Sequence, residues 1–299
     1  MSAALPLPRW QAFAASFAES RLALAALAAL AVILVAALAA PFISPQDPYD
    51  LARLDILDAK LAPGTQAASG FTYWLGSDDQ GRDMLSAILY GLRVSLGVGI
   101  AATLAALALG MAAGMTAGYA GGWLDALIMR IVDLQLSFPA MLLALVLLAV
   151  LGQGVDKIVI ALVAAQWAYY ARTARGAALV ERRKEYVDAA VCMALSPARI
   201  AFRHVLPNCL PPLVVVATVQ VAHAIALEAT LSFLGLGVPI TSPSLGLLIA
   251  NGFAHLLSGK YWISFFPGIA LLITLVAINL AGDRLRDVLD PRLHGHYGA

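Results

Sequence analysis

The residues of this chain that could carry chemistry are few, and their spacing fits neither nucleotide hydrolysis nor metal binding. The nearest approach to a phosphate-binding loop is Gly252 followed by Gly259-Lys260, with six residues between the glycines and Tyr261 after the lysine. A P-loop has four residues between its glycines and Ser or Thr after the lysine, because its backbone amides must surround the phosphates. The five histidines and two cysteines show no metal-ligand spacing. The sequence therefore predicts a protein that is not an enzyme and that holds no cofactor and no metal itself.

A second set of polar residues stands inside an apolar segment. Gln220, His223 and Glu228 interrupt the run 210–233, and polar groups within a membrane are costly and often functional. Glu228 and His223 are five residues apart, about 140° around a helix, so they do not share a face. Two interpretations stay open: these residues line a transport pathway or gate, or Glu228 is a structural group hydrogen-bonded within a helix bundle or to a partner.

A third feature is the stretch 172–208, which contains seven of the 19 basic residues. Val187, Ala190, Val191 and Ala194 recur at helical spacing without an intervening Gly or Pro, which predicts an amphipathic helix. Ser196-Pro197 has the form of a helix start, so a second short helix is expected from there to about residue 205, ended by Pro207. The small apolar face could dock on another protein, or the arginines could lie on anionic lipid.

The elements that must position these residues are membrane helices. The 299 residues are 61% hydrophobic and 12% charged, whereas soluble domains have about 45–50% and about 25%. Apolar runs long enough to cross a bilayer predict an all-α polytopic membrane protein with six transmembrane helices, at 22–42, 92–118, 126–151, 157–171, 210–233 and 263–281. Gly110, Gly114 and Gly118 recur every four residues, which favours close packing of two helices.

The distribution of basic residues predicts the orientation. With the N-terminus inside, 13 Lys and Arg residues fall on the cytoplasmic side and 6 on the outer side, as the positive-inside rule requires. The expected parts are a cytoplasmic segment 1–21, a first helix 22–42, a periplasmic loop 43–91 ending in an amphipathic helix 81–92, a five-helix core 92–282 with the cytoplasmic loop 172–208, and a cytoplasmic tail 283–299. Arg130 and Asp133 are expected to pair on one helix face. A net charge of +1 argues against nucleic-acid binding.

Four ordered blocks of this sequence resemble the permeases of ABC importers, in their dipeptide, oligopeptide and nickel branch. The run EYVDAAVCMALSPARIAFRHVLPN at 185–208 resembles the EAA loop of these permeases. The runs WLGSDDQGRDMLS at 74–86, EATLSFLGLGVP at 228–239 and GDRLRDVLDPRL at 282–293 are similar to further blocks of the family. Two positions depart from the family pattern: Asp188 replaces the Glu of the EAA triplet, and Ala194 replaces a Gly.

The resemblance implies a type I ABC importer permease bundle of the second-permease type in the bacterial inner membrane, with both termini in the cytoplasm. Its expected partners are a second homologous permease, two cytoplasmic ATPase subunits that hold ATP-Mg, a periplasmic or lipid-anchored solute-binding protein, and membrane lipid. The resemblance implies import of di- or oligopeptides, with nickel or another small solute as the alternative, and a self-sufficient secondary transporter as the rival outside the family. The residues expected to couple the loop to the ATPases are Glu185, Tyr186, Asp188, Ala189, Ala190, Ala194 and Arg199.

Overall fold

The computed structural model describes residues 9–50, 54–67, 69–239, 241–242 and 244–289. The outer parts of the expected cytoplasmic segment and tail, 1–8 and 290–299, lie outside these residues. The chain begins with α1 (Arg9–Ala18), α2 (Arg21–Ile43), the short 3-10 helix η2 (Ile56–Asp58), and the strands β1 (Thr65–Gln66) and β2 (Thr72–Tyr73). It continues with α3 (Met84–Ala120), α4 (Gly122–Leu136), α5 (Ala140–Leu151), α6 (Val155–Glu181), α7 (Glu185–Cys192), α8 (Pro197–Ile200) and the π-helical segment η3 (Ala201–Val205). The remaining elements are α9 (Leu206–Phe233), α10 (Leu245–Phe253), η4 (Leu256–Ser258) and α11 (Trp262–Leu289).

The predicted all-α class is confirmed, and the predicted number of spans is supported only roughly. Within the described residues, four helices are long and apolar enough to cross a membrane: α2, α3, the continuous helix Pro197–Phe233, and α11. The pair α4 and α5 makes a fifth candidate when it is taken as one bent span. α6 was expected to contain a span at 157–171, but it carries charged residues at both ends and does not meet the same criterion.

The segment expected to cross as one helix at 126–151 is broken. α4 and α5 meet at 89° across the residues Ser137, Phe138 and Pro139. Pro139 has no amide hydrogen to continue the ladder of α4, and its ring disfavours helical geometry at Phe138. α5 therefore starts in a new direction, with Pro139 as its N-cap residue.

The prediction that Pro207 ends the second loop helix is wrong. α8, η3 and α9 form one continuous helical path from Pro197 to Phe233. Pro207 is the second residue of α9, directly after η3, so its missing amide hydrogen falls where the hydrogen-bond pattern of the helix already changes. The π-helical turn before it, closed by the amide of Leu206 on the carbonyl of Ala201, absorbs the change in register.

The predicted close approach at the glycine stripe is confirmed and joins α3 to α6. A Cβ atom on Gly110 would lie 2.4 Å from the carbonyl oxygen of Trp167, and one on Gly114 would lie 2.2 Å from that of Ala171. These neighbours are backbone atoms that cannot turn aside. Glycine is therefore required for α3 and α6 to lie this close.

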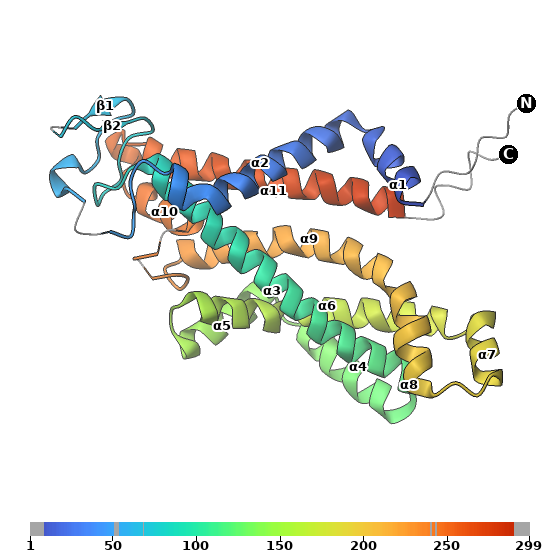
Figure 1. Ribbon diagram of the computed structural model, residues 1–299. Helices are drawn as coiled ribbons and strands as arrows, with labels where there is room; N and C mark the ends of the chain where they lie inside the picture. Colours follow the sequence, from blue (N-terminus) through green and yellow to red (C-terminus); the bar gives the residue numbers. More distant parts are fainter. Residues whose placement is uncertain (1–8, 51–53, 68, 240, 243, 290–299) are drawn as a thin grey trace, which may run out of the picture.

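The two ends of the bundle carry different elements. In Figure 1, α1, α7, α8 and the end of α11 lie at one end of the molecule, and β1, β2 and α10 lie at the other. The segments predicted to be cytoplasmic therefore share one end, and those predicted to be periplasmic share the opposite end. We refer to these as the loop end and the hairpin end.

The hairpin end is a compact cap built on the Gly-Arg-Asp block. Asp78 and Arg82 form a fully buried ion pair of 2.5 Å. The indole nitrogen of Trp262, at the start of α11, donates to the carbonyl of Ser77. Burial raises the pKa of Asp78, although the charge of Arg82 acts in the opposite direction. This cap ties the loop after α2 to the last helix of the bundle.

Two further expectations for this end are corrected. The amphipathic helix expected at 81–92 is not a separate element, because Asp83 caps α3 with its side chain and the helix runs on from Met84 into the span. α10 was not predicted from the sequence. Ser244 caps this helix, which buries Leu245, Leu247 and Leu248. α10 packs on α9 and α11, so it closes the hairpin end of the bundle.

Candidate functional site

A large cavity lies between α6 and α9 at the loop end. Its volume is about 1340 Å³, and Leu136, Arg286 and Leu289 complete its walls. Along α9 it extends from Asn208 to Gln220, which is 13 residues or about 18 Å of helix. Gln220 lies at the midpoint of α9. The cavity therefore reaches from the loop end to half the depth of the bundle.

The lining is divided between an apolar wall and a polar rim. The α9 wall consists mostly of Pro and Val side chains, at Pro211, Pro212, Val215, Val216 and Val219. Charged groups gather near the loop end, where Arg172, Glu181, Lys184 and Arg286 line the cavity. Three of these four side chains are basic and one is acidic, so the rim carries both signs of charge with positive charge in excess.

Gln220 is the predicted pathway residue that the structure places in the cavity wall. Its side chain is 8% exposed, and its carbonyl oxygen accepts a long hydrogen bond of 3.4 Å from the side chain of Gln166. Gln166 itself is 1% exposed, and its side-chain oxygen has no partner within the described residues. Gln166 was not predicted from the sequence, although it is an amide inside an apolar helix, the same signal that singled out Gln220.

Glu228 and His223 do not line this cavity. Glu228 is fully buried, and each of its carboxylate oxygens accepts a 2.7 Å hydrogen bond, one from Ser95 of α3 and one from Ser232 of α9. His223 is exposed on the other side of α9, as the predicted 140° separation requires. Glu228 therefore joins α3 to α9 on the hairpin side of the cavity, which agrees with the structural interpretation of this residue.

The loop between α6 and α8 is shorter than the expected 172–208, because α6 continues to Glu181. Its helix, α7, has two faces. Val187 and Ala190 are 4% and 2% exposed, and they pack against Ala178, Val205 and other residues of the same chain. The expectation that Ala190 belongs to an exposed docking face is therefore wrong. Glu185, Asp188, Ala189 and Val191 lie on the exposed face instead, and Arg199 is exposed on α8.

The end of α7 has the hydrogen bonds of a Schellman motif. The amide of Leu195 donates to the carbonyl of Ala190, and the amide of Ala194 donates to that of Val191. The motif needs left-handed backbone at its C′ residue, and Ala194 adopts it with a φ of 55°. The substitution of Ala for the family's Gly therefore leaves the turn in place but makes it strained, because left-handed geometry costs alanine about 1–2 kcal/mol.

Tyr186 points into the chain rather than away from it. Its hydroxyl donates to Glu181 at the end of α6, over 2.7 Å, and accepts from the side-chain amide of Asn208 in α9 over 3.3 Å. Lys184 donates to the other carboxylate oxygen of Glu181. Burial, followed by the hydrogen bond to Glu181, raises the pKa of Tyr186 to about 12. We call Glu181, Tyr186 and Asn208 the loop latch, since they join α7 to the two helices that wall the cavity.

Two ion pairs join α4 to α6 near the same end. Arg172 binds Asp133, and the guanidinium of Arg175 binds both carboxylate oxygens of Asp125. The expected pair of Arg130 with Asp133 is thus replaced by a pair between helices. Spacing along one helix could not reveal this, because the partner is 39 residues away. Within the described residues, no group of three or more His, Cys, Asp or Glu side chains is placed to hold a metal ion.

Comparison with known proteins agrees with this architecture. Residues 110–295 match the family described as binding-protein-dependent transport system inner membrane component, and residues 9–63 match the N-terminal TM domain of oligopeptide transport permease C. The chain is 40% identical to the dipeptide transport system permease protein DppC of Escherichia coli K12, over 98% of this chain and 96% of that protein. It is 37% identical to the di/tripeptide transport system permease protein DppC of Pseudomonas aeruginosa, over 95% of this chain and 91% of that protein.

Among solved structures, the chain is similar to one from the methionine ABC transporter MetNI in inward-facing conformations. The TM-score is 0.56 at 20% identity, over 69% of this chain and 98% of that one. This likeness supports the fold. Together with the family match, which covers more than half of the chain, and the near full-length relatives, it leads to one conclusion: the chain belongs to the family of inner membrane components of binding-protein-dependent transport systems, and it is a transport permease of the ABC importer type rather than an enzyme.

Proposed function

We propose that this chain forms half of the translocation pathway of an ATP-driven importer of peptides, most directly di- or oligopeptides. The relatives that cover nearly its whole length are named for dipeptide and di/tripeptide transport. The cavity adds a physical reason: apolar walls and a rim of both charge signs suit zwitterionic molecules with varied side chains. Import of nickel or another small solute is the alternative within the same type of complex.

The observation that carries the proposal is the asymmetry of the cavity. It extends from the loop end to Gln220 and stops there, while the hairpin end is closed by the bridge of Glu228 and by α10 packed on α9 and α11. We assign this arrangement to a state that is open to the cytoplasm and closed to the outside. Release of Glu228 from Ser95 would be one step in opening the outer gate, since that bond joins α3 to α9.

The partners follow from the same proposal. A second permease subunit would complete the pathway, and a solute-binding protein would deliver the substrate to the hairpin end. Two ATPase subunits would hold ATP-Mg and receive the exposed face of α7, with Glu185, Asp188 and Ala189 in contact and Ala194 and Arg199 beside them. Tyr186 and Ala190 would act from the inner face, by holding α7 to the bundle.

The loop latch would transmit movement of the docked α7 to the helices of the bundle. Glu181 and Asn208 both line the cavity, and Tyr186 connects them to α7. A displacement of α7 by the ATPases would therefore move α6 and α9 together. A bundle with two stable arrangements would then switch between them under the bias of its partners.

The test is purification of the tagged chain in mild detergent from its native membrane, followed by mass spectrometry and by uptake assays in vesicles. We expect a second permease and two ATPases to co-purify, and ATP-driven uptake of a labelled dipeptide to require the binding protein. Asp188→Lys should lose the ATPases and the uptake. Asp156→Lys, a charge reversal on an exposed residue at the opposite end of α6, is the matched control and should keep both.

Three results would each contradict a part of the proposal. Retention of the ATPases and of full uptake by Asp188→Lys would remove α7 from the docking surface. Uptake of the labelled dipeptide by the purified chain alone, driven by an ion gradient, would support a self-sufficient secondary transporter instead. Uptake of nickel or another solute, with no competition by peptides, would keep the complex and change the substrate.

A further inference from the structure

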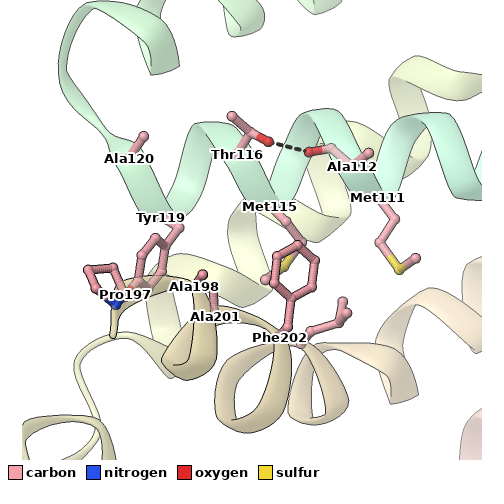
Figure 2. A pocket seen from close by; sticks show the side chains of 11 residues that line it. Met111, Ala112, Met115, Thr116, Tyr119, Ala120, Pro197, Ala198, Ala201 and Phe202 are labelled. Atoms are coloured by element: carbon pink, nitrogen blue, oxygen red, sulfur yellow. Dashed lines mark hydrogen bonds between the residues drawn. The ribbon is translucent and has the colours of Figure 1, made fainter. Parts of the chain in front are cut away.

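A second hollow lies on the outside of the bundle, away from the large cavity. It is an apolar groove of about 390 Å³ between the last turns of α3 and the path formed by α8, η3 and the start of α9. Figure 2 shows Phe202 extending toward Met115, and Tyr119 lying beside Pro197. Its lining includes Met111, Ala112, Met115, Thr116, Tyr119 and Phe202.

The groove offers almost nothing for a polar ligand to bind. No charged side chain is among the described residues that line it, and the hydroxyl of Thr116 is already bonded to the carbonyl of Ala112 over 2.7 Å. Phe202 lies at the edge of the groove and is 73% exposed. A large aromatic side chain beside an open apolar groove indicates that an apolar occupant covers it.

The position of the groove relative to the membrane indicates that its occupant comes from the lipid bilayer. Tyr119 lies in the last turn of α3 and the exposed Trp123 lies at the start of α4, and such aromatic residues sit at the level of lipid headgroups. Met111 is eight residues before Tyr119, or about 12 Å deeper along the helix. The groove therefore runs from the headgroup level into the hydrocarbon of the leaflet at the loop end.

The charge at the shallow end identifies the headgroup. Arg182 donates to the carbonyl of Tyr119 over 2.8 Å and stands 5.7 Å from the centre of its ring. Arg199 and Arg203 follow the groove residues Ala198 and Phe202 and are exposed. The sequence contains no acidic residue in 84–120 or in 189–227, so neither wall of the groove carries an acidic side chain.

From this combination we infer that the groove is a binding site for an anionic phospholipid, with an acyl chain along Met111, Met115 and Phe202 and the phosphate among Arg182, Arg199 and Arg203. The lipid would bind beside α8, the helix that directly follows α7 in the chain. A transmembrane helix of a partner subunit could also cover the apolar part, but it would leave the three arginines without a counterpart. The inference does not depend on which solute the chain transports.

The test places the photoreactive benzoylphenylalanine at position 202 of the full chain, in vesicles of equal parts phosphatidylglycerol and phosphatidylcholine. We expect the lipid adduct, identified by mass spectrometry, to contain phosphatidylglycerol at least fivefold more often than phosphatidylcholine. A basic residue near an anionic headgroup contributes about 1 kcal/mol, which corresponds to about fivefold in affinity. The same probe at Phe138, an exposed residue at the break between α4 and α5, reports the preference of ordinary annular lipid.

Two variants separate the parts of the site. Arg199→Gln with Arg203→Gln should bring the adducts at position 202 close to equal amounts of the two lipids. Arg286→Gln, which changes a basic residue of the large cavity, should leave the ratio unchanged. Ala112→Phe adds bulk to an exposed position of the groove wall, so it should reduce the adducts with both lipids without affecting insertion.

Two outcomes would overturn the inference. Equal labelling of the two lipids at position 202 of the otherwise unaltered chain would eliminate the headgroup site. An adduct between position 202 and another protein, in the native membrane and with no lipid adduct, would assign the groove to a subunit contact. Neither readout uses transport, so each distinguishes failure of the lipid site from failure of the proposed import function.

Discussion

At the scale of single residues, a few side chains in the loop that joins α6 to α8 have surroundings that the sequence pattern did not predict. Ala190 has the spacing of a docking residue but is buried within the chain. Tyr186 is adjacent to the acidic, exposed face, yet it is bonded to Glu181. Ala194 occupies a glycine position and keeps the glycine conformation. Each of these assignments can be tested separately.

Ala194→Gly should stabilise the loop. Glycine removes a left-handed strain of about 1–2 kcal/mol but gains about 0.4–1 kcal/mol of freedom in the unfolded chain, so a net gain of about 0.5–1 kcal/mol is expected. Amide hydrogen exchange over residues 185–196 should slow by about two- to fivefold. The control is Ala189→Gly, in the middle of α7 and exposed, which should speed exchange because glycine weakens a helix. Faster exchange in Ala194→Gly would contradict the strained-turn account.

Tyr186→Phe should loosen the loop latch while leaving the fold intact. The variant loses a hydrogen bond to a carboxylate, which contributes about 1–2 kcal/mol in a partly buried site. In the intact complex, we expect more ATP to be hydrolysed for each substrate molecule imported, because α7 would move with less effect on α6 and α9. Tyr169→Phe, at an exposed residue of the cavity wall, is the control. An unchanged ratio of hydrolysis to uptake in Tyr186→Phe would exclude the latch from coupling.

The same residue predicts a pH dependence. The pKa of Tyr186 is raised to about 12, above its ordinary value of 10, so the folded chain holds the phenol proton more tightly than the unfolded chain. The stabilisation is therefore complete below pH 10 and is lost as the pH rises from 10 to 12. Hydrogen exchange of α7 should be flat from pH 6 to 9 after correction for intrinsic rates, and Tyr186→Phe should lack the loss above pH 10.

At the scale of elements, the contact between α3 and α6 organises the molecule. Gly110, Gly114 and Gly118 let the backbones touch, and the ion pairs of Arg172 and Arg175 hold α4 against α6. α6 is therefore enclosed by its neighbours, with Ala165, Ala168 and Ala171 nearly or fully buried. Because its neighbours shield it from lipid, α6 can lie within the membrane although its hydropathy is lower than that of the other spans.

Gly114→Ala should damage this contact. The added methyl group would lie 2.2 Å from the carbonyl oxygen of Ala171, so the helices must separate, and such overpacking costs about 1–3 kcal/mol. Gly97→Ala is the matched control in the same helix, since its Cβ would meet nothing within 4 Å. In detergent, the temperature at which half of the protein aggregates should fall by several degrees for Gly114→Ala and stay equal or rise for Gly97→Ala. Equal effects of the two variants would show that the close contact is unimportant for stability.

At the scale of the whole molecule, the two ends have separate tasks. The hairpin end is closed by a buried ion pair, by α10 and by the Glu228 bridge. The loop end is hollowed by the large cavity on one side and by the apolar groove between α3 and α8 on another. Figure 1 places α7 and α8 at this hollowed end, together with α1 and the end of α11. The proposed orientation turns the hollowed end toward the cytoplasm.

Thiol labelling should verify that orientation. In a Cys192→Ser background, Leu57→Cys on η2 and Met193→Cys after α7 introduce cysteines at positions 88% and 67% exposed, while Cys209 is fully buried. A membrane-impermeant maleimide should label Leu57→Cys in intact spheroplasts and Met193→Cys only after lysis. The opposite pattern would invert the chain in the membrane, and labelling of both in intact spheroplasts would contradict the assignment of the two ends to opposite sides.

Much of this architecture was predictable from the sequence because the membrane imposes a local constraint. A span must be apolar over its own length, so α2, α3, α9 and α11 could be recognised from composition alone. The glycine stripe predicted a close contact between two helices, but it did not indicate which helix would pack against it. The Ser196-Pro197 helix start and the separation of His223 from Glu228 likewise follow from the geometry of one helix. The block matches then sufficed to place the chain in a transport family.

The tertiary structure alone decided which side of each helix faces its own chain. Spacing identified the apolar face of α7, but only the packing against Val205 and Ala178 shows that this face is internal. The pairing of Asp133 with Arg172, the bridge of Ser95 to Glu228 and the latch of Tyr186 with Asn208 each join residues 22 to 133 positions apart. Such contacts depend on how helices pack and where the chain bends, as at Pro139 and η3, and a periodic pattern within one segment holds no information about the segment that will lie beside it.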